Sequence, residues 1–355
     1  FDISQEIIGK IPGKPLAYWL PSQAISAFSA RKLQDVGITR RGLQTGNKDQ
    51  FIRYWHECNV NCMERNYLPR ESAIKSDAKW FMFNNGGEFR KWYGNLDLVV
   101  NWESNGRQLK SFDGAIIPSE DLYFLPAVSW SRLTSGENAF RQHLQGVLPG
   151  DLSPCYYSEN IDFQIAYLNS KCASYFLNAI NPSITAPVGD VAKLPVPLLS
   201  PDSESEIKKR VNQLLELHKY DWDSLETSWD FFIHPLIEMK SASKKLVSTW
   251  EIWHKNTITA FEKAKALEEE NNQLFIKQFD LQDELTPEVP EDQITLARAD
   301  REKDCQRLIS YAIGCMMGRY SLDEPGLVYA HAGNVGFEPG RYATFPADAD
   351  GIVPI

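Results

Sequence analysis

The sequence predicts an α+β fold in which a mixed, β-rich domain is followed by an α-helical region with one long helix. Up to about residue 200, short β-prone runs alternate with Gly, Asn and Pro, which is typical of strands joined by turns. Beyond it, apolar residues recur at helical spacing, and Ser203–Glu206 has the pattern of a capping box that begins a helix. We therefore expect domains at 1–200 and 201–320 and a loop-rich tail at 321–355, with the boundary in the proline-rich segment 195–201.

Four runs in the first domain have the composition of strands. They are rich in β-branched and aromatic residues and lie at 79–83, 96–102, 114–118 and 126–133. One helix is expected over residues 162–180, where apolar side chains recur every three or four positions. Asn181-Pro182 should end it, because a residue before proline disfavours the helical conformation.

The helical region contains a long periodic run from Ser243 to Leu285. Its seam repeats in steps of four and three and is interrupted by polar residues, which predicts a long helix packed against partner helices, with the stripe as core. Pro287 and Pro290 are expected to end this helix. A shorter and more apolar helix should follow within residues 305–322.

Composition places the chain among globular proteins: 355 residues, 43% hydrophobic, with a net charge of −10. It has no apolar run of the roughly 18 residues that span a bilayer and no secretory leader pattern, so we expect a cytoplasmic protein with no membrane partner. The start at Phe1, without Met, suggests a fragment. Six dispersed cysteines favour free thiols, and His56, Cys58 and Cys62 lack a second ligand pair, so no metal site is expected.

Charge is unevenly distributed along the chain. Residues 31–110 hold fourteen basic and nine acidic side chains, an excess of five positive charges, whereas the acidity lies mostly in the helical region. An acidic protein can therefore carry a basic face, and the overall charge does not exclude nucleic acid as a partner.

Motifs for several enzyme classes are missing from the sequence. Gly42 and Gly46 are separated by three residues and followed by Asn47, so residues 40–55 do not form a Walker A loop. Dinucleotide-binding, zinc-protease and α/β-hydrolase motifs are also absent. Residues 181–184 differ from the Asn-Pro-Pro-aromatic loop of amino-methyltransferases, and Glu103 lacks the lysine of a nuclease motif. We expect no catalytic residue in this chain.

Two segments, 79–95 and 129–136, combine basic and aromatic residues with amides in turns. Arg and Lys can neutralise phosphates, and Asn, Gln and Arg can contact base edges, so these segments are candidates for DNA contact. The alternative is that their aromatic residues form core and the polar neighbours a solvated rim. These aromatic residues are Trp80, Phe81, Phe83, Phe89 and Trp92.

Longer phrases of the sequence carry a family resemblance that extends over nearly the whole chain. In order, the phrases are GLQTGNKDQFIRYW, KWFMFNNGGEFRKWYGNLDLVVNWESNG, NPSITAPVGDVAKLPVP, YDWDSLETSWDFFIHPL and LISYAIGCMMGRYSLDEPGL. This series of phrases resembles the C-terminal half of the PglX-type adenine-specific DNA methyltransferases of BREX phage-defence systems and is similar to related single-chain type II restriction-modification enzymes.

The resemblance implies that residues 1–200 are a DNA target-recognition domain and that the methyltransferase domain, which binds S-adenosylmethionine, comes earlier in the parent protein. This chain alone should bind no cofactor and methylate nothing. Its implied partners are double-stranded DNA, the parent's methyltransferase domain and other defence-system proteins. The loop after residue 40 would present its polar side chains to DNA, and we expect DNA contacts from Arg40, Arg41, Thr45, Asn47, Lys48, Arg53, Lys79, Asn84, Asn85, Arg90, Lys91 and Arg132.

Gly189, Asp190, Leu194 and Pro195 match the segment that closes such recognition domains, and we interpret them as structural. Two other functional classes remain open. A specificity subunit of a multi-subunit restriction system also joins recognition domains to long helices, although it usually carries two of each and this sequence shows no internal repeat. A protein-interaction module of a defence complex would fit the acidic helical region.

Overall fold

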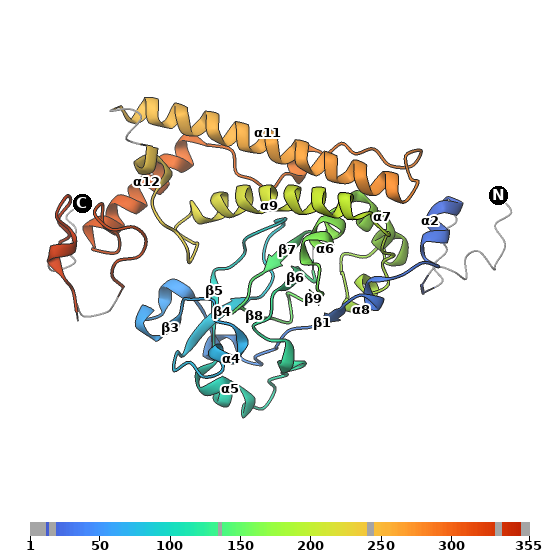
Figure 1. Cartoon of the computed structure of the whole chain (residues 1–355). Coiled ribbons are helices and arrows are strands. Elements are labelled where there is room, and N and C mark those ends of the chain that lie inside the picture. Colours follow the sequence, from blue (N-terminus) through green and yellow to red (C-terminus); the bar gives the residue numbers. More distant parts are fainter. Residues whose placement is uncertain (1–11, 14–18, 134–136, 240–244, 331–335, 349–355) are drawn as a thin grey trace.

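The computed structural model describes residues 12–13, 19–133, 137–239, 245–330 and 336–348. Its architecture is α+β, as predicted. Two long helices, α9 (Pro201–Asp223) and α11 (Leu246–Gln278), lie side by side along one side of the molecule, with the sheets below them in the view of Figure 1. α6 (Ile161–Leu168) and α7 (Lys171–Ile180) lie between the long helices and the strands (Figure 1). α12 (Arg301–Met316) and the C-terminal segment lie on the left of this view, at the opposite end of the molecule from α7.

The first sheet is antiparallel throughout its described strands. Its order is β1–β9–β6–β7, formed by Ile38–Arg40, Cys155–Tyr157, Ala127–Trp130 and Phe140–His143. β6 confirms the strand predicted within 126–133. β1 pairs with β9 alone among the described strands, so it is an edge of this sheet.

The second sheet is built around β4 (Trp80–Asn84), which confirms the strand predicted at 79–83. Antiparallel β5 (Leu98–Asn101) follows it and pairs with β2 (Ile52–Tyr54). On the other edge of β4, two short parallel strands lie end to end, β3 (Met63–Glu64) and β8 (Leu148–Pro149).

The strand predicted at 114–118 is wrong. Ile116 makes only an isolated bridge to Gln44, because Gly114 takes a positive φ of 94° and turns the chain before a strand can form. Three short helices lie between strands: α3 (Lys48–Phe51), α4 (Arg70–Ala73) and α5 (Glu103–Lys110). α2 (Ser22–Ala27) precedes β1, whereas α8 (Val188–Val191) and α10 (Pro235–Glu238) lie in the sequence between longer helices.

The single helix predicted over 162–180 is two helices, α6 (Ile161–Leu168) and α7 (Lys171–Ile180). Asn169 leaves the helical path because its side chain exchanges two hydrogen bonds, 2.9 and 3.0 Å long, with the backbone of Phe140 on β7. Ser170 then caps α7 by accepting a hydrogen bond from the Ala173 amide. The predicted stop at Asn181-Pro182 is confirmed.

α9 begins before the predicted capping box. Pro201 is its first residue and Ser200 its N-cap, with the Ser200 hydroxyl accepting a hydrogen bond from the Ser203 amide. Proline suits the first helical position because the backbone amide there has no hydrogen-bond partner within the helix, so the N–H that proline lacks is not missed.

α11 is the predicted long helix, but it ends well before Pro287. Asp280 adopts a left-handed φ of 55°, and the Leu281 amide donates to the Ile276 carbonyl at 3.0 Å. This is a Schellman arrangement, anchored by the fully buried Leu281. The expected shorter helix is confirmed as α12 (Arg301–Met316), capped by Asp300.

The main hydrophobic core joins both parts of the chain. It combines Trp130 of β6 and residues of α6 and α7 with Ile207 and Leu214 of α9 and with Phe275 of α11. The helical region therefore packs directly on the β-rich part and shares a core with it. α9 nevertheless starts within the segment 195–201, where a boundary between separate domains was expected. No helix among the described residues is long and apolar enough to cross a membrane.

Candidate nucleic-acid interface

The glycine loop, residues 41–47, connects β1 to α3 and is fastened to two other segments. The Leu43 amide donates to the Pro149 carbonyl, and its carbonyl accepts from the Asp151 amide, both at 2.9 Å. Gln44 exchanges two backbone hydrogen bonds with Ile116. The loop amides of Leu43 and Gln44 are thus already engaged, which explains physically why this loop is no phosphate cradle.

Two glycines are required by the close approach of the backbone. A Cβ on Gly42 would collide with the Pro149 carbonyl. Gly46 has a φ of 73°, and its Cβ would meet the Gly114 carbonyl carbon at 2.8 Å. The loop is therefore held in one conformation, and Asn47 fixes its end by capping α3 through a 3.2 Å hydrogen bond from the Gln50 amide.

Three charged side chains meet at the foot of this loop and form the Asp151 cluster: Arg41, Arg132 and Asp151. The Arg41 Nε donates to the Asp151 Oδ1 at 2.8 Å, and the Arg132 Nη1 lies 3.4 Å from the Asp151 Oδ2. Arg41 is half exposed, whereas Asp151 is mostly covered. One carboxylate thus orients two guanidinium groups, and a net positive charge remains.

A cavity of about 220 Å³ adjoins this cluster. Thr45, Lys48 and Asn85 line it together with Asp151, so residues from the glycine loop, α3 and the end of β4 converge there. Asn85 lies against Gly150, where a Cβ would overlap the Asn85 amide. Thr45 is largely buried, whereas Lys48 is exposed.

Arg53 and Lys79 form a second basic group at the opposite end of β4. Their charged ends lie 5.9 and 5.5 Å from the Trp80 ring centroid, within the range of cation–π contact. Both side chains are half-buried, and Arg53 also donates to the Ile52 carbonyl. Arg40, just before the glycine loop, and Asn47, its last residue, are both exposed.

Asn84 is placed between the two sheets. Its side chain is fully buried, and its Nδ2 donates to the Ser129 Oγ at 2.9 Å. The same Nδ2 lies 3.4 Å from the His143 Nδ1, and burial lowers the pKa of that imidazole to about 4. Asn84 thus serves the fold, and we do not include it in the proposed interface.

Arg90 and Lys91 are directed to the helices. Arg90 forms a 2.7 Å ion pair with Asp221 of α9, and Lys91 forms a buried 2.7 Å ion pair with Glu268 of α11. The Trp92 indole donates to the same Glu268 carboxylate. Both cations are occupied by carboxylates, so they too are left out of the interface.

Two residues that sequence reasoning missed organise this region. Asp151 gives no local signal, because its partners Arg41 and Arg132 are distant in sequence. Arg141 is fully buried on β7, where burial lowers its pKa to about 10, and it donates to the Arg90 carbonyl and the Ser131 hydroxyl. Across the part of the chain that the structure describes, no group of three or more His, Cys, Asp or Glu is placed to hold a metal ion.

Comparisons with known proteins identify relatives over nearly the whole chain. It is 33% identical to the adenine-specific methyltransferase PglX of Lacticaseibacillus casei (strain Zhang), over 97% of this chain and 29% of that protein. It is 32% identical to the adenine-specific methyltransferase BrxX of Escherichia coli O9:H4 (strain HS), over 98% of this chain and 29% of that protein. No protein-family model matches the chain.

These identities show that the chain is related to PglX-type adenine-specific methyltransferases, as the sequence resemblance predicted. The chain spans less than a third of the length of these relatives. That share is consistent with correspondence to part of their C-terminal half.

Proposed function

We propose that this chain is the DNA target-recognition portion of an N6-adenine DNA methyltransferase of a BREX-type phage-defence system. In this proposal the chain binds double-stranded DNA, and a separate methyltransferase domain of the parent protein binds S-adenosylmethionine and transfers the methyl group. The relationship to two adenine-specific methyltransferases supports the class of reaction. DNA methyltransferases act on a base taken out of the duplex, so a recognition surface must hold the flanking DNA.

The observation that carries the proposal is the convergence of the glycine loop and the Asp151 cluster. The loop is rigid, and Arg40, Arg41 and Lys48 are exposed on it or beside it, with Arg132 half-exposed next to them. Cations on a fixed backbone can contact phosphates in a defined register. Asn47 and Asn85 supply amides of the kind that contact base edges.

The test is the salt dependence of DNA binding by the full chain. Replacing Arg40, Arg41 and Lys48 with Ala removes three candidate phosphate contacts. Each lost contact should make the negative slope of log K against log salt less steep by about 0.9. Fluorescence anisotropy with a labelled duplex at low salt measures both affinity and slope.

A matched control removes three lysines from the helical region. Lys208, Lys255 and Lys263 are exposed on α9 and α11, and their replacement with Ala changes the net charge equally. The control should keep the original slope. If the control variant makes the salt dependence less steep while the glycine-loop variant does not, DNA binds the helices and the proposed interface is wrong.

A further inference from the structure

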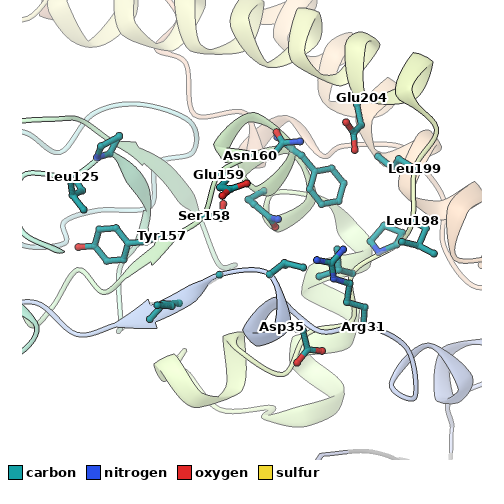
Figure 2. Close-up of a pocket in the computed structure, with 18 residues that line it drawn as sticks. Arg31, Asp35, Leu125, Tyr157, Ser158, Glu159, Asn160, Leu198, Leu199 and Glu204 are labelled. Atoms are coloured by element: carbon teal, nitrogen blue, oxygen red, sulfur yellow. The ribbon is translucent and has the colours of Figure 1, made fainter. Parts of the chain in front are cut away.

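A second site lies on the other side of β1 from the glycine loop, where the chain enters that strand. Its cavity of about 780 Å³ is bounded by the segment 31–38, the end of β9, the start of α6 and the proline-rich segment 196–199 that leads to α9 (Figure 2). This volume lies within the range of ligand-binding pockets. None of the residues proposed to contact DNA lines it.

Two residues that line this cavity each carry a buried polar atom with no hydrogen-bond partner among the described residues. Gln164 of α6 is only 3% exposed, and its Oε1 accepts no hydrogen bond. The Ser158 hydroxyl, after β9, is also buried without a partner. Unpaired buried polar groups destabilise a fold. An amide that both accepts and donates is complementary to a peptide group.

The charges around the cavity are mainly negative. Asp35, Glu159 and Glu204 face a single cation, Arg31. Glu159 and Glu204 are exposed and form no ion pair within the described ranges, whereas Asp35 already accepts a 2.8 Å hydrogen bond from the Lys32 amide. Figure 2 shows Glu159 and Glu204 on the side of α6 and α9, across from Arg31 and Asp35. The open carboxylates are complementary to a cationic group.

Apolar side chains and a strand edge complete the site. Ile38 is 44% exposed at the start of the edge strand β1, and Leu198 is 79% exposed on the proline-rich segment. An extended polypeptide presents alternating side chains together with free amide groups, so it can cover apolar residues and reach the polar groups at once. A small aliphatic amine would satisfy the carboxylates but leave the apolar residues uncovered.

We propose that this cavity binds an extended segment of a partner protein that carries Lys or Arg next to apolar residues. The cationic side chain lies between Glu159 and Glu204, and a peptide group pairs with the Gln164 amide. Apolar side chains of the segment cover Ile38 and Leu198. This activity is separate from DNA recognition and does not depend on it.

The test uses two designed peptides and a charge exchange in the full chain. The basic probe is acetyl-Val-Lys-Val-Lys-Val-amide, and the acidic probe has Glu in place of Lys. Calorimetric titration should give a dissociation constant for the basic probe that is about tenfold lower than for the acidic one. The double variant Glu159→Lys, Glu204→Lys should reverse this preference. An unchanged preference, or no binding of the basic probe at about 1 mM, overturns the proposal.

Gln164→Leu separates a ligand-binding role from a structural one. Leu removes an unpaired buried amide, so the variant should unfold at the same or a higher temperature while binding the basic probe about tenfold more weakly. A lower unfolding temperature with unchanged binding would show that Gln164 only serves the fold and would contradict the proposed peptide contact. Spermidine is the competitor, and displacement of the probe by equimolar spermidine would show an amine site and contradict the polypeptide assignment.

Discussion

Breaking the buried ion pair between Lys91 and Glu268 should strongly destabilise the protein. The Lys91 Nζ lies 2.7 Å from the Glu268 Oε2, and the two side chains are 7% and 3% exposed. Lys91→Met leaves the Glu268 carboxylate with only the Trp92 indole as partner. Glu268→Gln leaves the Lys91 ammonium buried without a counter-charge. Each single change should cost about 3–5 kcal/mol, because an unpaired charge remains in the interior.

The double variant should be more stable than either single variant. Lys91→Met with Glu268→Gln removes both charges and keeps an amide oxygen that can accept from Trp92, so the remaining cost should be about 1–2 kcal/mol. Urea unfolding followed by tryptophan fluorescence gives the free energy of unfolding for all four proteins. The coupling energy of this cycle should then exceed about 3 kcal/mol. Strictly additive costs would refute the reasoning, because they would show that the two charges do not depend on each other.

Three further predictions concern the sheets and the glycine loop. Burial lowers the folded-state pKa of His143 to about 4, so between pH 6.5 and 4 only the unfolded state gains this proton, and the free energy of unfolding should fall by about 1.4 kcal/mol per pH unit as pH falls through that range. In urea unfolding across these pH values, the free energy of unfolding of His143→Asn should depend less steeply on pH. An unchanged pH dependence would contradict the prediction. Asn84→Leu should cost about 1–3 kcal/mol through the lost bond to Ser129 yet leave the salt slope of DNA binding unchanged, which anisotropy measures. Gly42→Ala should cost about 1–3 kcal/mol of stability and weaken DNA binding, whereas the control Gly189→Ala, with open space at its Cβ, should be neutral or stabilise the protein by up to about 1 kcal/mol. Equal free energies of unfolding for the two variants would contradict the close packing of the glycine loop.

Local sequence signals predicted β4, β5 and β6 and the longer helices α9, α11 and α12, but not the short strands and short helices between them. The run at 79–83 forms β4 because its aromatic residues fill two cores, and the periodic pattern in 243–285 forms α11 because its apolar side chains pack on α9 and α7. One error, at 114–118, has the local cause of the Gly114 turn, and another arose where a distant partner decides the backbone. Asn169 breaks the expected helix only because the Phe140 backbone is available to bond with it, and the sequence near Asn169 carries no sign of this.

The candidate site was predictable in outline but not residue by residue. The glycine loop stands out by composition, and in the structure it is closely packed and held by backbone hydrogen bonds to two other segments. Arg90 and Lys91 have the same local signal as Arg41, since all three are basic residues near glycines and aromatics. They differ in partners that lie far along the chain: Asp221 is 131 residues from Arg90, and Glu268 is 177 residues from Lys91. Only the fold separates an exposed cation from one that holds two parts of the protein together.

These ion pairs also determine how the segment 84–92 is held. One end of the segment carries Asn85 of the candidate interface, and two residues further on the Gly87 carbonyl accepts a hydrogen bond from the Ser131 hydroxyl. The other end is fixed to α9 and α11 through Arg90, Lys91 and Trp92. Because unpairing either buried charge is costly, α9 and α11 cannot shift on the sheets without taking this segment along. The long helices therefore stabilise the position of Asn85, and the cycle variants at Lys91 should weaken DNA binding even though Lys91 does not reach the interface.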